Sequence, residues 1–408
     1  MLAFEDRCGR EHVEVRLERA APPHEQRSTE GATLRMGRIW KERVDFMTEL
    51  EQARAVISEA DREMAKLFTK RMEAVRTVAA YKRAHGLPIT DRSREEEMLR
   101  EEAGLIEDET LRPFYVSFLK ETIGISKRYQ HRLMDGLRVA YSGVEGAFAN
   151  IAAQKIFPDA TAMPYADFAA AYRAVEEGRC DCAVLPIENS LNGDVGRVLD
   201  LAYFGKLYVS GVYEVEIVHN LLAVKGTTMD EVRTVVSHEQ ALGQCAQYLE
   251  KHGFETQEAV NTAVAAKMVA EAGRHDLVAI GSAEAAERFG LKVLESHIND
   301  SSNNSTRFAV FTRERREPGT DDGRFLMLFS VNNAAGSLGR AINVIGEYGF
   351  NLLALKSRPR KELAWEYYFY AESEGNIASE QGRKMLDALR ECCNDLKVLG
   401  SYEREVRV

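Results

Sequence analysis

The sequence predicts a multidomain protein in which an all-helical region, an α/β region and an α+β region follow one another. Helical periodicity runs without Gly or Pro from Thr48 to Arg83, and short apolar strands then alternate with helical stretches from about 137 to 313. Beyond a charged linker, the last stretch shows the order βαββαβ. A chain of 408 residues, 45% of them hydrophobic, is long enough for two or three cores of ordinary size.

Composition excludes several classes of protein. A net charge of −10 argues against nucleic acid as the main partner, although a local cluster of Arg and Lys can still hold a small anion. No apolar run reaches the roughly 20 residues that a membrane helix needs, and the N-terminus lacks the apolar core of a signal peptide. The six cysteines show no spacing suited to disulfides or zinc. We therefore expect a cytoplasmic protein without metal or cofactor that binds neither nucleic acid nor membrane.

The first 46 residues differ from the rest of the chain. They are rich in Arg and Glu, contain the turn-like stretch APPHEQRSTEG and show no sustained helical or strand period. We expect a poorly ordered extension over residues 1–46. An alternative is that the true start is Met47, since the first strong helical pattern follows it directly.

Residues 47–135 are predicted to form an all-helical domain of three helices. The long first helix is followed by helical segments from Asp91 to about Gly104 and from Leu111 to about Met134. A helix of over 30 residues cannot bury its apolar stripe against two shorter ones. We therefore expect an intertwined homodimer or a higher homo-oligomer.

Charged and polar residues interrupt the stripes of these helices at regular spacing. Arg71 and Lys82 are about three turns apart and share a face, and Ser126 and Gln130 repeat the pattern at i, i+4. Taken singly, each such residue is more often a surface charge. As a set, they resemble the all-helical chorismate mutases over about 80 residues, on the positions Arg54, Asp61, Arg71, Lys82, Asp91, Glu95, Ser126 and Gln130.

This resemblance implies the pericyclic rearrangement of chorismate to prephenate, which needs neither nucleophile nor metal. Arg71 and Arg54 are expected to clamp the two carboxylates, with Arg54 reaching across from the other subunit. Lys82 and Gln130 are expected to face the ether oxygen, where negative charge develops. The remaining members of the set are expected to hold the ring hydroxyl or to order the site: Asp91, Glu95 and Ser126.

The region 137–313 is predicted to be α/β with a mostly parallel sheet, and polar groups follow several of its strands, where ligands gather in such sheets. The motifs PIENS, SHEQALGQC and TRF resemble those of the prephenate dehydratases. The resemblance implies two lobes around a cleft, as in periplasmic binding proteins, and conversion of prephenate to phenylpyruvate. Its implied catalytic residue is Thr306, which assists departure of the ring hydroxyl.

The same resemblance implies a set of substrate-binding residues: Glu188, Asn189, Ser190, His238, Gln240, Ser282, Arg307 and Phe308. Arg307 is expected to bind a carboxylate or to act as a structural brace. Asn189 and Ser190 have the alternative of capping the next helix, and His238 that of a structural role. The chain departs from the family pattern at Ala147, which lacks the usual hydroxyl.

The C-terminal stretch 324–402 is predicted to be ferredoxin-like and resembles the ACT domains of dehydratases. The resemblance rests on two motifs, Gly336, Ser337, Leu338 and then Ser357, Arg358, Pro359, in which Ser337 and Lys356 depart from the usual residues. It implies L-phenylalanine as a feedback effector, and the alternative is a purely dimerising module.

The whole chain is therefore predicted to be a bifunctional enzyme of L-phenylalanine biosynthesis. One alternative is a monofunctional dehydratase with a structural, dimerising helical domain. Another is a non-catalytic sensor of small molecules, since both the two-lobed fold and the C-terminal domain suit ligand binding.

Overall fold

The computed structural model describes residues 30–360, 365–403 and 406–408, with side chains described from Thr48 onward. The chain divides into two units, Met1–Ala74 and Val75–Val408, and each is considered by itself. Every described helix falls short of the length or the apolarity that crossing a membrane requires.

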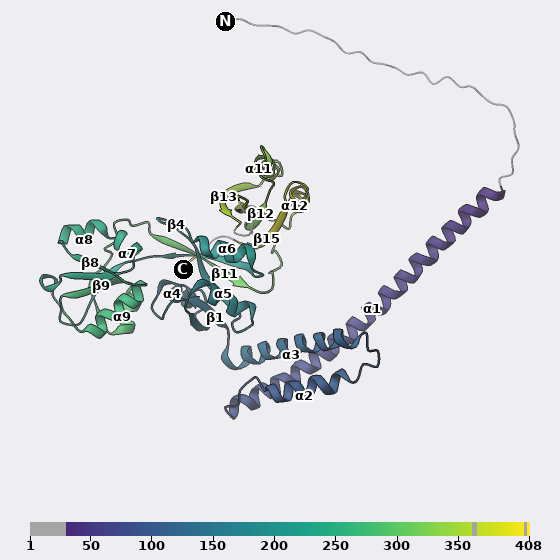
Figure 1. Cartoon of the computed structure of the whole chain (residues 1–408), viewed down its shortest axis with the longest axis horizontal. Helices are drawn as coiled ribbons and strands as arrows, with labels where there is room; N and C mark the ends of the chain where they lie inside the picture. Colours follow the sequence, from purple (N-terminus) through teal and green to yellow (C-terminus); the bar gives the residue numbers. More distant parts are fainter. Residues whose placement is uncertain (1–29, 361–364, 404–405) are drawn as a thin grey trace, which may run out of the picture. The chain divides into compact units, whose positions relative to one another are not determined.

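Helix α1 (Glu30–Ala84) supplies the described part of the first unit and continues into the second (Figure 1). It begins well before Thr48, so residues 30–46 of the expected poorly ordered extension are helical, while residues 1–29 lie outside the described residues. The reason is local: no proline follows Pro23 until Pro88, and isolated glycines cost a helix only about 1 kcal/mol each.

Two further helices, α2 (Arg92–Ala103) and α3 (Arg112–Asp135), follow as the periodicity predicts. The Asp91 side chain accepts a hydrogen bond from the Arg94 backbone N–H and so caps α2. Pro113 stands at the start of α3, where its missing N–H costs nothing. Lys127 of α3 pairs with Glu95 of α2 at 2.7 Å.

The next segment folds into a first lobe around a sheet with strand order β16-β5-β11-β3-β1-β2, with β4 pairing β3 at the side. Its strands are β1 (Arg138–Ser142), β2 (Thr161–Tyr165), β3 (Cys182–Asn189), β4 (Gly193–Asp194), β5 (Tyr208–Glu216), β11 (Ser305–Thr312) and β16 (Val406–Arg407). Its helices are α4 (Phe148–Ile156), α5 (Phe168–Glu176) and α6 (Gly196–Phe204).

A second lobe is built on a sheet with strand order β10-β6-β9-β7-β8. Its strands are β6 (Asn220–Ala223), β7 (Thr234–Ser237), β8 (Glu255–Glu258), β9 (Leu277–Gly281) and β10 (Lys292–Glu295). Its helical elements are η1 (Met229–Glu231), α7 (Glu239–Gly243), α8 (Ala246–His252), α9 (Thr262–Ala272) and α10 (Ala283–Phe289).

Both sheets are mixed, which corrects the expectation of a mostly parallel sheet. Strands β1, β2 and β3 are parallel, but β11 runs antiparallel to both β3 and β5. The cause is the connection between lobes: the chain leaves the first lobe after β5 and returns in β11. The two crossing segments are bonded to each other, since Ile217 N donates to Asn304 O at 2.9 Å.

The C-terminal part has the predicted βαββαβ order and a sheet ordered β13-β14-β12-β15. Its elements are β12 (Arg324–Ser330), α11 (Ser337–Glu347), β13 (Asn351–Pro359), β14 (Tyr367–Glu374), α12 (Glu380–Cys392) and β15 (Asp395–Tyr402). One sheet face packs on α11 and α12 around Phe325 and Phe329. The other shares a core with the first lobe, where Tyr368 stacks on Tyr203 of α6 at 4.0 Å.

Candidate active sites

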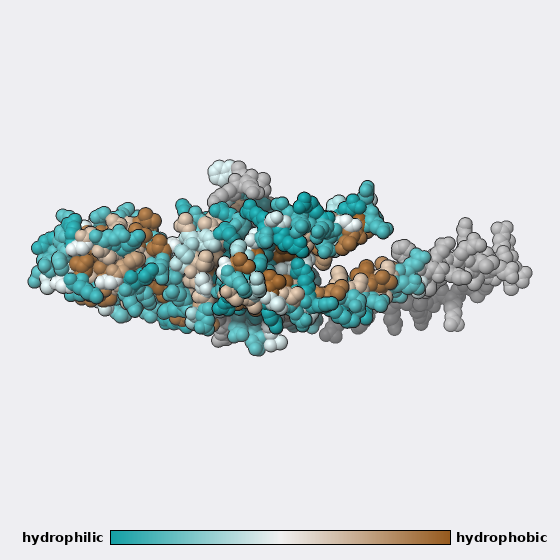
Figure 2. Space-filling model, turned by 90° about the horizontal axis from the view of Figure 1, so that it is seen from below, coloured by the Kyte–Doolittle hydropathy of each residue, from teal (hydrophilic) through white to brown (hydrophobic). Residues whose placement is uncertain are grey.

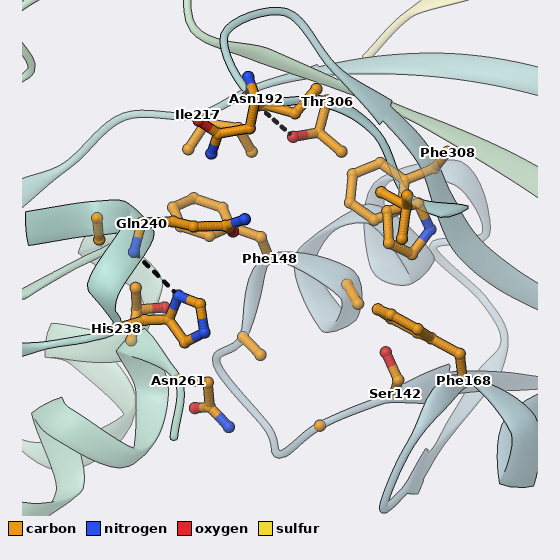
Figure 3. Close-up of a pocket in the computed structure, with 18 of the residues that line it drawn as sticks. Ser142, Phe148, Phe168, Asn192, Ile217, His238, Gln240, Asn261, Thr306 and Phe308 are labelled. Atoms are coloured by element: carbon orange, nitrogen blue, oxygen red, sulfur yellow. Dashed lines mark hydrogen bonds between the residues drawn. The ribbon is translucent and has the colours of Figure 1, made fainter. Parts of the chain in front are cut away.

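A cavity of about 720 Å³ is lined by residues of both lobes. In Figure 3, Thr306 and Phe308 of the first lobe lie across the cavity from His238 and Gln240 of the second, and Phe148 lies between them. The lining mixes aromatic rings with amides and hydroxyls, the composition typical of a site for a small ligand.

Five of the residues predicted for the dehydratase site line this cavity: Asn189, His238, Gln240, Thr306 and Phe308. The other four predicted residues are absent from the lining: Glu188, Ser190, Ser282 and Arg307. Ser190 donates instead to the Asn303 carbonyl at 2.7 Å, and Ser282 caps α10.

Strand geometry explains this division. Successive side chains of a strand point to opposite faces, so Arg307 faces away from the cavity that Thr306 and Phe308 line. In β3 the pairing with β11 shifts register, because Arg307 opposes Glu188 whereas Phe308 opposes Pro186. The intervening Ile187 is thus an extra residue, and this bulge lets both Pro186 and Asn189 line the cavity although they are three residues apart.

The Asn189 side chain fixes the role of the Thr306 hydroxyl. Its Oδ1 accepts from the backbone N–H groups of Leu191 and Asn192, and its Nδ2 lies 3.0 Å from Thr306 Oγ1. These backbone partners determine which end of the amide is nitrogen, and an amide nitrogen can only donate. Thr306 Oγ1 therefore accepts in this contact and keeps its own proton for another partner. The alternative that Asn189 caps a helix is not what is seen.

The hydrogen bonds continue from Asn189 into the second lobe. Asn189 Nδ2 also lies 3.0 Å from Asn304 Oδ1 and 2.9 Å from the Ser305 carbonyl, so its two protons are shared among three acceptors. Asn304 Nδ2 in turn donates to Gln244 Oε1 at 2.8 Å. Gln244 Oε1 lies 2.8 Å from His219 Nε2, which must then carry the proton. Burial lowers the pKa of His219, although the Gln244 bond opposes this shift, so the imidazole is neutral at neutral pH.

The N-terminal ends of several helices surround the cavity, and sequence reasoning missed this. The N-cap residues of five helices line it: Ala147 of α4, Asp167 of α5, Val195 of α6, His238 of α7 and Asn261 of α9. Helix N-termini carry partial positive charge and suit anionic ligands. The sequence did hold a signal for this arrangement, because a predicted helix follows the strands that end in polar residues.

His238 has a structural role in addition to lining the cavity. Its Nδ1 accepts from the Gln240 backbone N–H at 3.2 Å and caps α7. Ala147 occupies the N-cap position of α4 without a side-chain cap, so the missing family hydroxyl corresponds to a missing helix cap. Gly143 and Gly146 adopt positive φ angles of 99° and 86°, which preserves the turn before α4.

Arg197, near the start of α6, was also missed. It is the lone Lys or Arg among the described residues that line the cavity. A cation in the first turn of a helix opposes the helix dipole, so local helix stability does not explain its presence.

Arg307 lies in an ion network on the opposite side of the strand. Its guanidinium contacts Glu188 at 3.0 Å and Glu372 of β14 at 2.7 Å. Lys356 of β13 contacts Glu188 at 2.7 Å. Burial raises the pKa of Glu188, but the hydrogen bonds and charges of Lys356 and Arg307 outweigh it, so the pKa lies below its usual value. The same balance, with bonds from Arg307 and Tyr402, lowers the pKa of Glu372.

The predicted mutase residues fall in both units. Arg54, Asp61 and Arg71 belong to the first unit, and Lys82, Asp91, Glu95, Ser126 and Gln130 to the second. Within the second unit, Lys82 Nζ donates to the Ile89 carbonyl at 2.7 Å. Gln130 is 7% exposed, and its Oε1 has no hydrogen-bond partner among the described residues.

The residues predicted to bind an effector lie at two elements of the C-terminal part, the start of α11 and the end of β13. Gly336 precedes α11 with a positive φ of 81°, and Ser337 and Leu338 begin that helix. Ser357, Arg358 and Pro359 end β13, and Arg358 Nε donates to Asp200 of α6 at 2.8 Å.

Comparison with known proteins agrees with this architecture. A family model described as chorismate mutase type II matches residues 53–131, and one described as prephenate dehydratase matches residues 139–316. The chain is 31% identical over 369 residues to a bifunctional chorismate mutase/prephenate dehydratase of Aquifex aeolicus, covering 88% of this chain and 99% of that protein.

Two further relatives each match about two thirds of this chain. Arogenate dehydratase 2 of Petunia hybrida is 38% identical over 281 residues, covering 65% of this chain and 71% of that protein. A crystal structure of prephenate dehydratase in complex with L-Phe from Arthrobacter aurescens aligns with a TM-score of 0.62 at 26% identity. That alignment covers 66% of this chain and 90% of the other.

The fold and the cavity define a multidomain enzyme in which a helical mutase precedes a two-lobed α/β dehydratase. The chain belongs to the bifunctional chorismate mutase/prephenate dehydratase family. It converts chorismate to prephenate and prephenate to phenylpyruvate.

Proposed function

We propose that Thr306 donates the hydrogen bond that assists departure of the ring hydroxyl of prephenate. The observation that carries this proposal is the Asn189 amide, which occupies a lone pair of the Thr306 oxygen and leaves its proton for a ligand in the cavity. A donor aimed at the leaving oxygen stabilises negative charge as the C–O bond breaks.

The substrate carboxylates require different surroundings. The ring carboxylate leaves as carbon dioxide, so a cation bound to it would stabilise the ground state more than the transition state. Apolar rings such as Phe148, Phe168 and Phe308 suit this carboxylate. The pyruvyl carboxylate persists into the product, and Arg197 together with the helix N-termini is suited to hold it.

Exchanging Asn189 for aspartate tests the role of Thr306. A carboxylate can only accept, so Asn189→Asp would draw the Thr306 proton toward itself and away from the substrate. We expect dehydratase kcat to fall by about two orders of magnitude, with mutase turnover of the same chain unchanged as internal control. An Asn189→Asp chain with full dehydratase turnover would exclude this role.

For the mutase, we propose the residue roles that the resemblance to the all-helical chorismate mutases implies. Arg54 and Arg71 clamp the carboxylates, Lys82 and Gln130 face the ether oxygen, and Asp91, Glu95 and Ser126 order the site. The buried Oε1 of Gln130, which has no hydrogen-bond partner within the described part of the chain, supports a ligand position beside it.

A homodimer or higher homo-oligomer is proposed from the helical part. Large apolar side chains of the first unit remain exposed, with Ile57 at 60% and Leu67 at 64%. Figure 2 shows apolar side chains, in brown, at the surface of the helical part. A second copy of the chain would cover this stripe, and Arg54 would then serve the partner's mutase site.

Regulation by L-phenylalanine and a cytoplasmic location complete the proposal. The βαββαβ unit and its two ACT-like motifs support an effector site, and a related dehydratase was crystallised with L-Phe. Titration of dehydratase activity with phenylalanine tests this, and unchanged turnover at millimolar ligand would favour a purely dimerising module.

A further inference from the structure

We propose that Lys356 is a positioning residue of the dehydratase cleft, supplied by the C-terminal part of the chain. Its ammonium group contacts Glu188 Oε1 at 2.7 Å and Asp194 Oδ1 at 2.5 Å. The Lys356 side chain is only 14% exposed. These contacts tie β13 to the short hairpin formed by β3 and β4, and Figure 1 labels β13 and β4.

The hairpin cannot hold its shape easily without this cation. Glu188 and Asp194 lie directly opposite each other in the β3–β4 pairing. Like charges at directly opposed positions destabilise a strand pair. Lys356 lies between the two carboxylates and replaces their repulsion with attraction on both sides.

The position of the Asn189 side-chain amide depends on this hairpin. Asn189 follows Glu188 and pairs with Gly193, which precedes Asp194. Asn189, Asn192 and Asp194 all line the cavity. Splaying of the Glu188–Asp194 pair would move Asn189, and with it the hydrogen bond that determines the role of Thr306.

Strand β13 also contacts helix α6, which follows the hairpin. Arg358, two residues after Lys356 and therefore on the same face of β13, holds both carboxylate oxygens of Asp200 at 2.8 and 3.2 Å. Its guanidinium lies against Gly196, where an added Cβ would clash. The cavity-lining stretch from Asn189 to Arg197 is thus held on both sides by the C-terminal part.

Charge balance distinguishes Lys356 from an ordinary surface lysine. Among the described residues, ion pairs join three cations to three carboxylates: Lys356, Arg307 and Arg324 with Glu188, Asp194 and Glu372. Without Lys356, no described cation would bridge Glu188 and Asp194, whose side chains are 28% and 33% exposed. Facing carboxylates that are partly shielded from water repel each other more strongly than fully exposed ones.

A mutant cycle tests the proposal. Lys356→Met should lower dehydratase kcat about tenfold, because Asn189 is displaced, while Lys356→Arg should retain activity within about twofold. In the Glu188→Gln background, which lacks the opposed charge, the same Lys356→Met change should cost less than about twofold.

Lys397 offers the matched control. It also reaches from the C-terminal part to the first lobe, donating to the Ala202 and Gly205 carbonyls at 2.9 and 2.8 Å, but it does not touch the hairpin. Lys397→Met should leave dehydratase kcat unchanged, and mutase turnover serves as a folding control in every variant. An equal effect of Lys356→Met in both backgrounds, or an effect no larger than that of Lys397→Met, would overturn the proposal.

Discussion

The dehydratase cleft and the helical region both handle dianionic substrates, but they are completed differently. The cleft gathers Asn189, Thr306 and His238 from both lobes of one chain and is surrounded by helix N-termini. The helical region leaves a stripe of apolar side chains exposed, and the buried Oε1 of Gln130 has no hydrogen-bond partner among the residues that the structure describes. The mixed sheet completes its site by bringing distant strands together, whereas we propose that a second copy of the chain covers the face of the long helix.

The sharpest separation of the two regions is expected from Thr306→Val, which keeps the side-chain shape and removes the donor. Dehydratase kcat should fall about a thousandfold, while chorismate is still converted and prephenate accumulates. Thr312→Val on the same strand removes a hydroxyl that donates to the Glu314 carbonyl, and it should leave both activities intact. Equal turnover of the Thr306 variant and wild type would remove the proposed donor role.

The reciprocal change is Lys82→Ala. Mutase turnover should fall about a hundredfold, because the donor to the developing ether oxygen charge is lost, with dehydratase turnover unchanged. Stopped assays of prephenate formation from chorismate measure this. Lys120→Ala, an exposed lysine of α3, is the control. Undiminished mutase activity without Lys82 would count against its assignment.

Arg197→Met tests how the cleft holds its anion. The KM for prephenate should rise about tenfold, and the inhibition constant of phenylpyruvate should rise in parallel, since the product keeps the pyruvyl carboxylate. Arg173→Met, an exposed arginine of α5 outside the cavity, should change neither constant. A rise confined to prephenate would place Arg197 at the ring carboxylate instead.

Acid should weaken the contact between the C-terminal part and the first lobe, where the buried Glu372 carboxylate pairs with Arg307. The pKa of Glu372 is lowered in the folded state, so its stabilising contribution is present above the unfolded-state pKa and is lost as pH falls through the lower folded-state pKa. Urea unfolding in steps from pH 7 down to about 3 should show a shallower loss for Glu372→Gln than for wild type. Glu374→Gln, exposed on the same strand, should follow wild type, and identical slopes for all three proteins would refute the linkage.

The smallest effect is expected at the uncapped helix α4. Ala147→Ser should stabilise the chain by about 0.5–1 kcal/mol, because a hydroxyl at the N-cap can accept from a free N–H of the first turn. Thermal unfolding measures this, and an unchanged or lower Tm would show that the turn at Gly146 has no room for the cap.

The sequence allowed the order of folds and most elements to be predicted, because periodicity and capping are local. It placed Thr306, Asn189 and His238 among the site residues, and they line the cavity. Arg307 was grouped with these residues because it belongs to the same motif as Thr306. Successive side chains of a strand point to opposite faces, so the Arg307 side chain faces away from the cavity. The bulge at Ile187 depends on pairing between β3 and β11, and Arg197 reaches the cavity only through the packing of α6, so neither has a local signal.

Subunit complementation tests the contrast between the regions most directly. Chains carrying Arg54→Ala and chains carrying Lys82→Ala, each defective in the mutase, are co-expressed. If Arg54 serves the partner's site, mixed dimers contain one intact mutase site, and roughly a quarter of wild-type mutase activity should return. Dehydratase turnover should be the same in all preparations, because that cleft is complete within one chain. Absence of any recovered mutase activity would contradict the account.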